Sequence, residues 1–380
     1  MKLMILKDQL NDAIQQVSKA ASSRPAIPIL GGIKIDVTHH GITLTASDTD
    51  ISIQSFIETE SDKQVNARVD KPGSVVLPAK FIVEIVKKLP ADEVEIEVGD
   101  NFQTKIRSGS SDIQMVGLDP EEFPVLPSIE ENESFSVPGD LLKSMIRQTS
   151  FAASTSEQTP ILTGVLWNLA EEQFKFVATD RHRLASRSSH VETSSGHRFS
   201  NIVISSKTLV ELSKVVPDNQ SLVDIVVTDN QVLFKLGHVL FYSRLLEGIY
   251  PDTSKIIPQV FKTELVLDTK KLTDAIDRAY LMSREEKTNI VRLITLDNGM
   301  IEISSSSAEL GRVTEHLDAA EFNGDPLRVA FNSKYMLDCL KVIDSEKIFI
   351  GFNGAMSPII IRPTDHAHSL HIILPYRTTG

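Results

Sequence analysis

Apolar residues recur at every third or fourth position in several segments of the chain, which is the spacing of a helix with one buried face. In the segment nearest the N-terminus, Leu10, Ile14 and Val17 follow this spacing, and Pro25 and Pro28 lie where such a helix has to end. The same spacing predicts helices at residues 7–24, 80–88, 140–147, 207–214, 268–284 and 334–341.

Between the predicted helices, apolar and polar residues alternate one by one, which is the period of a strand with one buried face. This alternation occurs at residues 32–37, 41–47, 50–57 and 93–98, the last reading Glu-Val-Glu-Ile-Glu-Val. We expect the three glutamates of that strand to share a solvent-exposed face. Because the links between strands are too short for parallel crossovers, the sheets are predicted to be antiparallel and the fold to be α+β.

One pattern of helices and strands occurs three times along the chain. Lys80, Lys207 and Lys334 open the second helix of each copy and are evenly spaced, at about one third of the 380 residues. The first helix of each copy carries a matching leucine, at Leu10, Leu142 and Leu272. A repeat of this size is a whole domain. We therefore predict three tandem copies of one domain, each with two helices packed on antiparallel sheets, at residues 1–128, 129–256 and 257–380.

The composition is that of an ordinary globular protein, with 41% hydrophobic and 24% charged residues. No apolar run approaches the ~18 residues that a membrane-spanning helix needs, so no membrane partner is expected. Cys339 is the single cysteine, which excludes an intramolecular disulfide and favours a reducing compartment, the cytoplasm. Its apolar helical position predicts a small core side chain rather than a nucleophile.

The formal net charge of −12 argues at first against a nucleic-acid partner. The charges are unevenly distributed, however. The predicted helices carry more Lys and Arg than Asp and Glu, and the rest of the chain holds the acidic excess. Basic helices on an acidic body are what a protein needs to hold a polyanion on one face and repel it elsewhere.

Two short polar segments, each with an aspartate, are the candidates for catalysis or metal binding. Asp48 and Asp50 form an Asp-x-Asp that could bind Mg²⁺, but they lie where a turn enters a predicted strand, which favours a structural role. Asp180, His182 and Arg183 form a denser polar phrase without a nearby nucleophile. Because the first copy has the aspartate but not the histidine and arginine, we interpret the aspartate as structural and the other two as binding residues. No catalytic residue, metal site or cofactor is predicted.

Five short segments of the chain lie at residues 22–33, 178–185, 248–258, 331–340 and 373–377. Their sequences, order and spacing together resemble the bacterial DNA polymerase III beta subunit family, the sliding clamps. The resemblance implies DNA-clamp domains in a head-to-tail homodimer that closes into a ring. Such a ring encircles double-stranded DNA, slides without reading sequence and tethers the replicative polymerase. It is a processivity factor without an active site of its own.

The resemblance also implies three kinds of site. Basic residues expected to face DNA are Arg24, Lys80, Lys143, Arg147, Lys207, Lys214, Lys271, Arg278 and Lys334. A groove for partner peptides would be formed by Leu162, Thr179, His182, Arg183, Leu184, Pro251, Ile256, Asn332, Tyr335, Met356, Pro358, Ile373, Leu374, Pro375, Tyr376 and Arg377. The dimer contact would use Ile113, Met115, Leu281 and Met282.

The partners implied by the resemblance are double-stranded DNA, a second copy of the chain, the replicative polymerase and the clamp loader. Clamp-motif peptides of repair polymerases, mismatch-repair proteins and ligase are further implied partners, and the expected location is the cytoplasm, at the nucleoid. The residues alone leave two alternatives open. One is a metal-dependent nuclease or transferase using Asp48 and Asp50, which the absence of Asp-x-Asp from the second copy disfavours. The other is a protein-interaction scaffold that binds no nucleic acid.

Overall fold

The computed structural model describes residues 1–22, 24–25, 27–61, 64–126, 129, 134–193, 198–258, 260–285, 288–297, 299–366 and 368–377. The chain forms two compact units, Met1–Asp140 with Glu211–Leu245, and Leu141–Val210 with Leu246–Gly380. The middle sequence copy therefore contributes to both units. No helix in the described ranges is long and apolar enough to cross a membrane.

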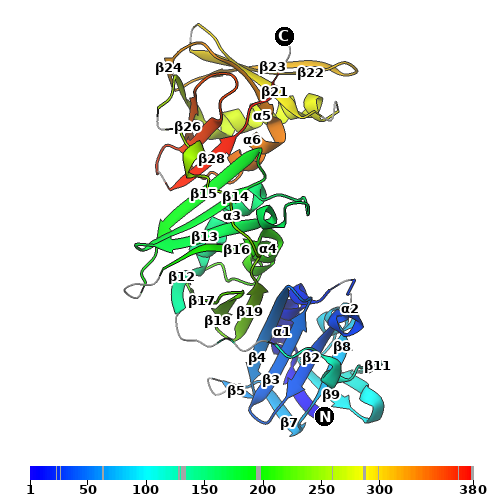
Figure 1. Cartoon of the computed structure of the whole chain (residues 1–380). Coiled ribbons are helices and arrows are strands. Elements are labelled where there is room, and N and C mark those ends of the chain that lie inside the picture. The colour runs from blue at the N-terminus through cyan, green and yellow to red at the C-terminus, as the bar shows by residue number, and fades with distance from the viewer. Residues whose placement is uncertain are drawn as a thin grey trace. The chain divides into compact units, whose positions relative to one another are not determined.

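The first unit contains two large sheets (Figure 1). Among the described residues, one sheet has the strand order β11-β10-β9-β1-β7 and the other β12-β17-β18-β19-β4-β3-β2-β8, with a small β5-β6 hairpin beside them. The strands are β1 (Lys2–Leu6), β2 (Gly32–Val37), β3 (Gly41–Ser47), β4 (Ile51–Glu58), β5 (Glu60–Ser61), β6 (Gln64–Val65), β7 (Ala67–Lys71), β8 (Gly73–Pro78), β9 (Glu93–Val98), β10 (Gln103–Ser108), β11 (Ser111–Val116), β12 (Ser134–Pro138), β17 (Leu222–Val227), β18 (Gln231–Leu236) and β19 (Val239–Arg244). The helices α1 (Lys7–Val17) and α2 (Ala79–Lys87) pack against each other.

The second unit also contains two large sheets, with the strand orders β16-β13-β14-β15-β28-β27-β26-β20-β24 and β23-β22-β21-β25 in its described part. The strands are β13 (Gly164–Ala170), β14 (Gln173–Thr179), β15 (Arg183–His190), β16 (Phe199–Ser205), β20 (Thr263–Asp268), β21 (Ile290–Thr295), β22 (Met300–Ser307), β23 (Gly311–Asp318), β24 (Glu321–Gly324), β25 (Arg328–Asn332), β26 (Lys347–Phe352), β27 (Ile359–Pro363) and β28 (Ser369–Ile373). The helices α5 (Thr269–Glu285) and α6 (Ser333–Leu340) pack against each other, whereas α3 (Gly139–Thr149) and α4 (Ser206–Ser213) each run across a boundary between the units.

The largest sheet of each unit is built from two neighbouring sequence copies. In the first unit β4 pairs antiparallel with β19, and in the second unit β15 pairs antiparallel with β28. The other pairings between described strands are antiparallel as well, as the short links predicted. The chain thus has the predicted α+β organisation of three tandem copies joined by continuous sheets.

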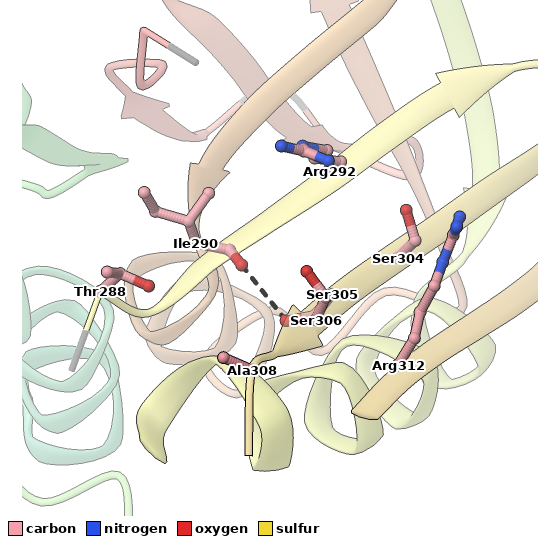
Figure 2. A pocket seen from close by; sticks show the side chains of 8 residues that line it. All are labelled: Thr288, Ile290, Arg292, Ser304, Ser305, Ser306, Ala308 and Arg312. Atoms are coloured by element: carbon pink, nitrogen blue, oxygen red, sulfur yellow. Dashed lines mark hydrogen bonds between the residues drawn. The ribbon is translucent and has the colours of Figure 1, made fainter. Parts of the chain in front are cut away.

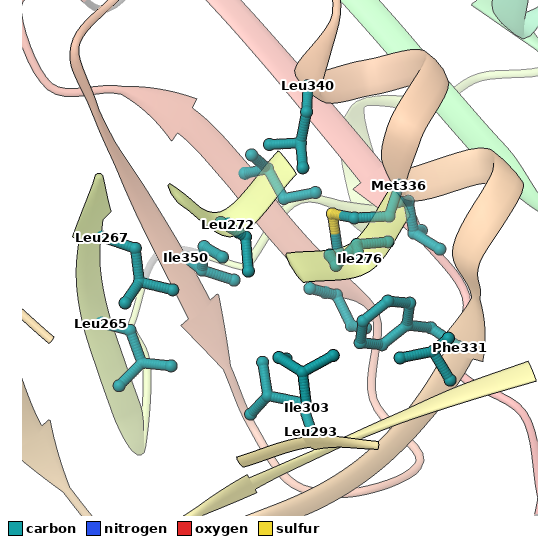
Figure 3. Packing of buried hydrophobic residues seen from close by; sticks show 14 of the residues in the cluster. Leu265, Leu267, Leu272, Ile276, Leu293, Ile303, Phe331, Met336, Leu340 and Ile350 are labelled. Carbon is teal, nitrogen blue, oxygen red and sulfur yellow. The ribbon is translucent and has the colours of Figure 1, made fainter. Parts of the chain in front are cut away.

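The core of the third copy lies between α5, α6 and the sheets (Figure 3). Leu272 and Ile276 on α5 are fully buried there, together with Phe331 and Met336. Cys339 belongs to the same core, and burial raises the pKa of its thiol well above the usual value. The prediction of a core side chain at this position is confirmed.

The first helix is shorter than its sequence pattern predicted. We expected it at residues 7–24, but α1 ends at Val17 and is followed by the 3₁₀ turn Ser18–Ala20, after which Ala21 is extended. The Ser18 hydroxyl donates a hydrogen bond to the backbone oxygen of Gln15, 3.0 Å away. Such local hydrogen bonds compete with the helical ladder, and the apolar spacing does not reveal them.

The remaining helices begin and end within three residues of the predicted positions. The shorter 3₁₀ turns were not predicted; they are Ser18–Ala20, Pro28–Gly31, Asp100–Phe102, Pro120–Glu122, Ser150–Ala152, Pro160–Thr163 and Ser254–Ile256. Strands predicted at 32–37, 41–47 and 93–98 have the observed bounds, and the one predicted at 50–57 lies at Ile51–Glu58.

The glutamates of β9 are less exposed than predicted. Glu95 is half-buried, because Lys2 on β1 lies 3.2 Å away on one side and Arg107 on β10 lies 3.3 Å away on the other. Side-chain hydrogen bonds from Lys2 and Arg107 lower the pKa of the Glu95 carboxyl. The outer face of this sheet is therefore a ladder of opposite charges, the arrangement that cross-strand neighbours favour.

Replacing Leu272 by alanine tests the core of the third copy. Because Leu272 is fully buried between α5 and the sheets, we expect Leu272→Ala to lower the free energy of unfolding by about 2–5 kcal/mol. Urea denaturation followed by circular dichroism measures this change. The control Val260→Ala, at an exposed position, should stay within about 0.5 kcal/mol of the parent chain. Equal effects of the two substitutions would contradict this account of the core.

Candidate functional site

A tight turn between β14 and β15 forms the centre of the predicted groove. The Asp180 Oδ1 atom accepts hydrogen bonds from the backbone N–H groups of His182 and Arg183, each at 2.9 Å. The Thr179 hydroxyl donates to the backbone oxygen of Arg183 at 2.6 Å, and Arg181 has a left-handed φ of 76°. Asp180 is therefore structural, as predicted, and the turn leaves His182 exposed at the surface.

Arg183 connects this turn to α6. Its Nε lies 3.0 Å from the Asp180 carboxylate, and its Nη1 lies 2.6 Å from the carboxylate of Asp338. Its Nη2 donates to the backbone oxygen of Phe151 at 2.5 Å, and the guanidinium lies 4.6 Å from the centre of the Tyr335 ring. Because all three guanidinium nitrogens have partners, Arg183 ties the turn to α6 and lies against the Tyr335 ring.

The C-terminal segment lies along the same turn. Strand β28 pairs with β15, and the Leu374 N–H donates to the backbone oxygen of His182 at 2.9 Å. Two residues later, the Tyr376 N–H donates to the backbone oxygen of Ala330 on β25 at 2.7 Å. Residues 374–377 are thus held between the middle and third copies, with Leu374 38% and Tyr376 42% exposed.

Beneath the exposed residues lies an apolar cluster drawn from both copies. It consists of Leu162, Val177, Leu184, Val203, Tyr250, Ile360 and Ile372. The Tyr250 hydroxyl accepts a hydrogen bond from the Thr179 N–H at 3.0 Å, and burial raises the pKa of this phenol. The cluster packs the middle copy against the third.

Apart from Arg183, which is half-buried, the predicted groove residues fall into two groups. Buried residues form the foundation, namely Leu162, Thr179, Leu184, Asn332 and Ile373. Exposed and half-buried residues can meet a ligand, namely His182, Pro251, Ile256, Tyr335, Met356, Pro358, Leu374, Pro375, Tyr376 and Arg377. Asn332 caps α6 through its Oδ1, which accepts from the N–H groups of Lys334 and Tyr335. Met356 and Pro358 lie on the loop between β26 and β27.

Sequence reasoning missed three residues that hold this site: Phe151, Tyr250 and Asp338. Each contacts Thr179 or Arg183 through a hydrogen bond that spans a long stretch of chain. Tyr250 lies in a phrase that carried the resemblance, but neither its spacing nor that of the other two identifies the partner.

The predicted DNA-facing cations differ in how they are engaged. Arg147 pairs with Asp344 at 2.6 Å, Arg278 binds Glu315 through two hydrogen bonds of 2.8 Å, and Lys214 pairs with Glu211 at 2.6 Å. Lys143 is half-buried. The remaining cations are exposed and have no carboxylate within ion-pair distance in the described part of the chain, namely Arg24, Lys80, Lys207, Lys271 and Lys334.

The predicted dimer residues lie at an open sheet edge and at a helix end. Strand β11 pairs only with β10 among the described strands, and its Ile113 and Met115 are half-buried. On α5, Leu281 is 47% exposed and Met282 is half-buried. An unpaired strand edge with apolar side chains is a surface that can pair with another chain.

A polar cavity of about 470 Å³ lies away from the groove, on β21, β22 and β23 (Figure 2). It is lined by Thr288, Ile290, Arg292, Ser304, Ser305, Ser306, Ala308 and Arg312. The Ser305 hydroxyl donates to the backbone oxygen of Ile290, and Arg312 pairs with Glu302. This lining has no carboxylate, histidine or cysteine, so it supplies no base to activate a serine.

Asp48 and Asp50 do not form a metal site. The Asp48 Oδ1 atom accepts from the N–H groups of Asp50 and Ile51 at 3.1 and 2.9 Å, and burial raises the pKa of the Asp48 carboxyl. Within the described ranges, no three His, Cys, Asp or Glu side chains gather where they could hold a metal ion. The geometry gives no support to a metal-dependent nuclease or transferase.

Comparison with known proteins agrees with the three tandem copies. Sequence models of the N-terminal, central and C-terminal domains of the DNA polymerase III beta subunit match residues 1–127, 136–252 and 254–377. The beta sliding clamps of Halalkalibacterium halodurans and Bacillus subtilis are 49% and 50% identical to the chain, with all of each protein covered. The crystal structure of the Bacillus subtilis DNA polymerase sliding clamp matches with a TM-score of 0.97 over 100% of both chains, at 49% identity. The chain therefore belongs to the DNA polymerase III beta subunit family, the beta sliding clamps, which are processivity clamps and not themselves catalytic.

Proposed function

We propose that two copies of this chain join head to tail into a ring around double-stranded DNA. The observation that carries the proposal is the charge distribution: exposed, unpaired cations on helices of a chain whose net charge is −12. The domain boundaries of the ring are proposed at residues 1–128, 129–256 and 257–380. Its location is the cytoplasm, at the nucleoid.

A ring retains DNA by topology, so its lining needs only a moderate positive charge. Each phosphate contact strengthens binding and makes it salt-dependent, and many such contacts would hinder movement along the duplex. Contacts to phosphates carry no sequence information. A few exposed lysines and arginines on each copy therefore suit a clamp that slides without sequence preference.

The groove beside residues 374–377 tethers proteins to the ring. Exposed Leu374 and Tyr376 over a buried apolar floor suit a short peptide with apolar side chains, because such anchors dominate binding in small pockets. The proposed occupants are peptides of the replicative polymerase and the clamp loader, followed by clamp-motif peptides of repair polymerases, mismatch-repair proteins and ligase.

Charge reversal of three exposed cations tests the lining; Lys80 and Lys207 lie on α2 and α4, and Arg24 lies beyond the end of α1. The triple variant Arg24→Glu, Lys80→Glu and Lys207→Glu should be loaded less and lost faster from a nicked circular plasmid, because it repels phosphates. Loading by the clamp loader and gel filtration of the bound fraction measure this. The control is a second triple variant, Lys71→Glu, Lys347→Glu and Lys175→Glu, at other exposed or half-buried positions. It has the same net charge as the first triple variant. Equal retention of the two folded variants would remove these helices from the lining.

An aspartate at Leu281 tests ring closure. Leu281→Asp would place an unpaired charge in a small apolar contact, at a cost on the order of several kcal/mol of association. Sedimentation should show a folded monomer, and circular dichroism reports the folding. The control Leu222→Asp changes an exposed leucine of the first unit and should leave a dimer. If Leu281→Asp also sediments as a dimer, the interface lies elsewhere.

Removal of the two exposed anchors tests the groove. In the double variant Leu374→Ala and Tyr376→Ala, each truncation should weaken peptide binding by about 2 kcal/mol. The affinity for a labelled clamp-motif peptide, followed by fluorescence anisotropy, should fall at least tenfold while the dimer persists. Val65→Ala, an exposed valine in the first unit, is the control. Unchanged affinity in the double variant would place the peptide site outside this groove.

A further inference from the structure

The first unit contains a turn with the same hydrogen bonds as the turn of the groove. Between β3 and β4, the Asp48 Oδ1 atom accepts from the N–H groups two and three residues later, as Asp180 does in the second unit. The Ser47 hydroxyl donates to the backbone oxygen of Ile51 at 3.1 Å, where Thr179 donates to Arg183. Thr49 has a φ of 84°, the counterpart of 76° at Arg181.

The strands and loops around the two turns correspond as well. The Arg244 N–H, at the end of β19, donates to the backbone oxygen of Asp50 at 3.0 Å, as the Leu374 N–H donates to His182 at 2.9 Å. The Ser22 N–H donates to the backbone oxygen of Leu30, and in the second unit Ser154 donates to Leu162 in the same way. The first unit therefore repeats the scaffold of the peptide groove.

This repeated scaffold encloses a cavity of about 330 Å³, which we call the first-unit groove. Pockets for small ligands and peptide side chains begin at about this size. Apolar side chains supply much of the lining, including Leu30, Pro124, Val125, Leu126 and Tyr242. Val125 is 95% exposed, and Leu30 rests on the buried cluster of Ile29, Val76 and Phe123. A rigid floor and an exposed apolar rim suit an apolar side chain of a ligand.

Arg244 distinguishes the first-unit groove from the groove of the second unit. It lines the cavity at the place that corresponds to Leu374 and has no carboxylate partner within ion-pair distance among the described residues. A guanidinium without a counter-charge attracts a carboxylate.

We infer that the first-unit groove binds a short extended peptide segment in which an acidic residue follows an apolar one. The apolar side chain packs against Val125 and Tyr242, and the acidic side chain pairs with Arg244. Asp50 lines the same cavity and repels a second carboxylate, so a single acidic residue suits the site better than a polyanion such as a nucleic acid. The peptide class is the one proposed for the second unit, so the inference rests in part on that proposed function.

Direct titration in a chain with the second-unit groove disabled tests the inference. The probe is a fluorescein-labelled peptide of sequence Gly-Leu-Asp-Leu-Phe-Gly, and the parent is the full-length double variant Leu374→Ala and Tyr376→Ala. The parent should still bind one peptide per chain, whereas the chain without substitutions should bind two. A parent that binds no peptide overturns the inference. The difference in peptide binding between the parent and the unsubstituted chain reports separately on the second-unit groove.

Two substitutions in the parent locate the remaining site. Val125→Asp and Arg244→Glu each remove a proposed contact at an exposed position, so folding is preserved and the affinity should fall at least tenfold. The matched controls Leu222→Asp and Arg198→Glu make the same chemical changes at other exposed positions and should leave the affinity within twofold. If all four variants bind alike, the residual peptide lies elsewhere and the inference is wrong.

A second peptide tests the charge preference. Replacing the aspartate of the probe by lysine should weaken binding to the parent at least tenfold, and Arg244→Glu should restore binding of the lysine peptide. Equal affinity of the parent for the two peptides would overturn the pairing with Arg244. Displacement of the aspartate peptide by a duplex oligonucleotide at equal concentration would instead identify a nucleic-acid site and also overturn the inference.

Discussion

The antiparallel pairing between strands of neighbouring sequence copies is the interaction on which both proposed binding sites depend. Where β28 pairs with β15, the ladder continues one hydrogen bond further, from the Leu374 N–H to the backbone oxygen of His182. That bond places the C-terminal segment against the turn, and the turn is itself fixed by the Asp180 carboxylate. A groove between two copies can be rigid only if the copies share a sheet, because loops alone would not hold its walls at a constant separation.

Arg183 reinforces this joint by linking a turn of the middle copy to α6 of the third. The guanidinium is largely buried between two carboxylates and two aromatic rings. A buried charge of this kind is tolerated because each guanidinium nitrogen has a partner, whereas removal of one partner would leave the other charges uncompensated. The same contacts hold the Tyr335 ring in place, so the stability of the joint and the shape of the groove depend on one side chain.

Periodicity in the sequence predicts elements well where each element is defined by its own side chains. Strands β2, β3 and β9 have their predicted bounds because the alternation of apolar and polar side chains is the period of an extended strand. The end of α1 was predicted poorly, since a hydrogen bond from Ser18 ends the helix before the prolines do. The partners of Arg183 could not be predicted either, because Phe151 and Asp338 come close only through the fold. The predicted groove residues came from the resemblance to a known family. The residue pattern alone identified only Asp180, the aspartate of the turn, as structural.

Comparison of the two turns separates what the scaffold requires from what each site adds. Both need an aspartate that accepts two backbone N–H groups, a hydroxyl residue just before it and a left-handed residue just after it. These residues are set by the backbone, so they recur in both units whatever the ligand. The positions that face outward are free to differ: His182 and Leu374 in the second unit correspond to Asp50 and Arg244 in the first. Since the shared hydrogen bonds hold both backbones in one geometry, the chemical character of each groove is decided by a few side chains at its rim. A repeated domain can therefore acquire a new binding preference through surface substitutions that leave its folding untouched.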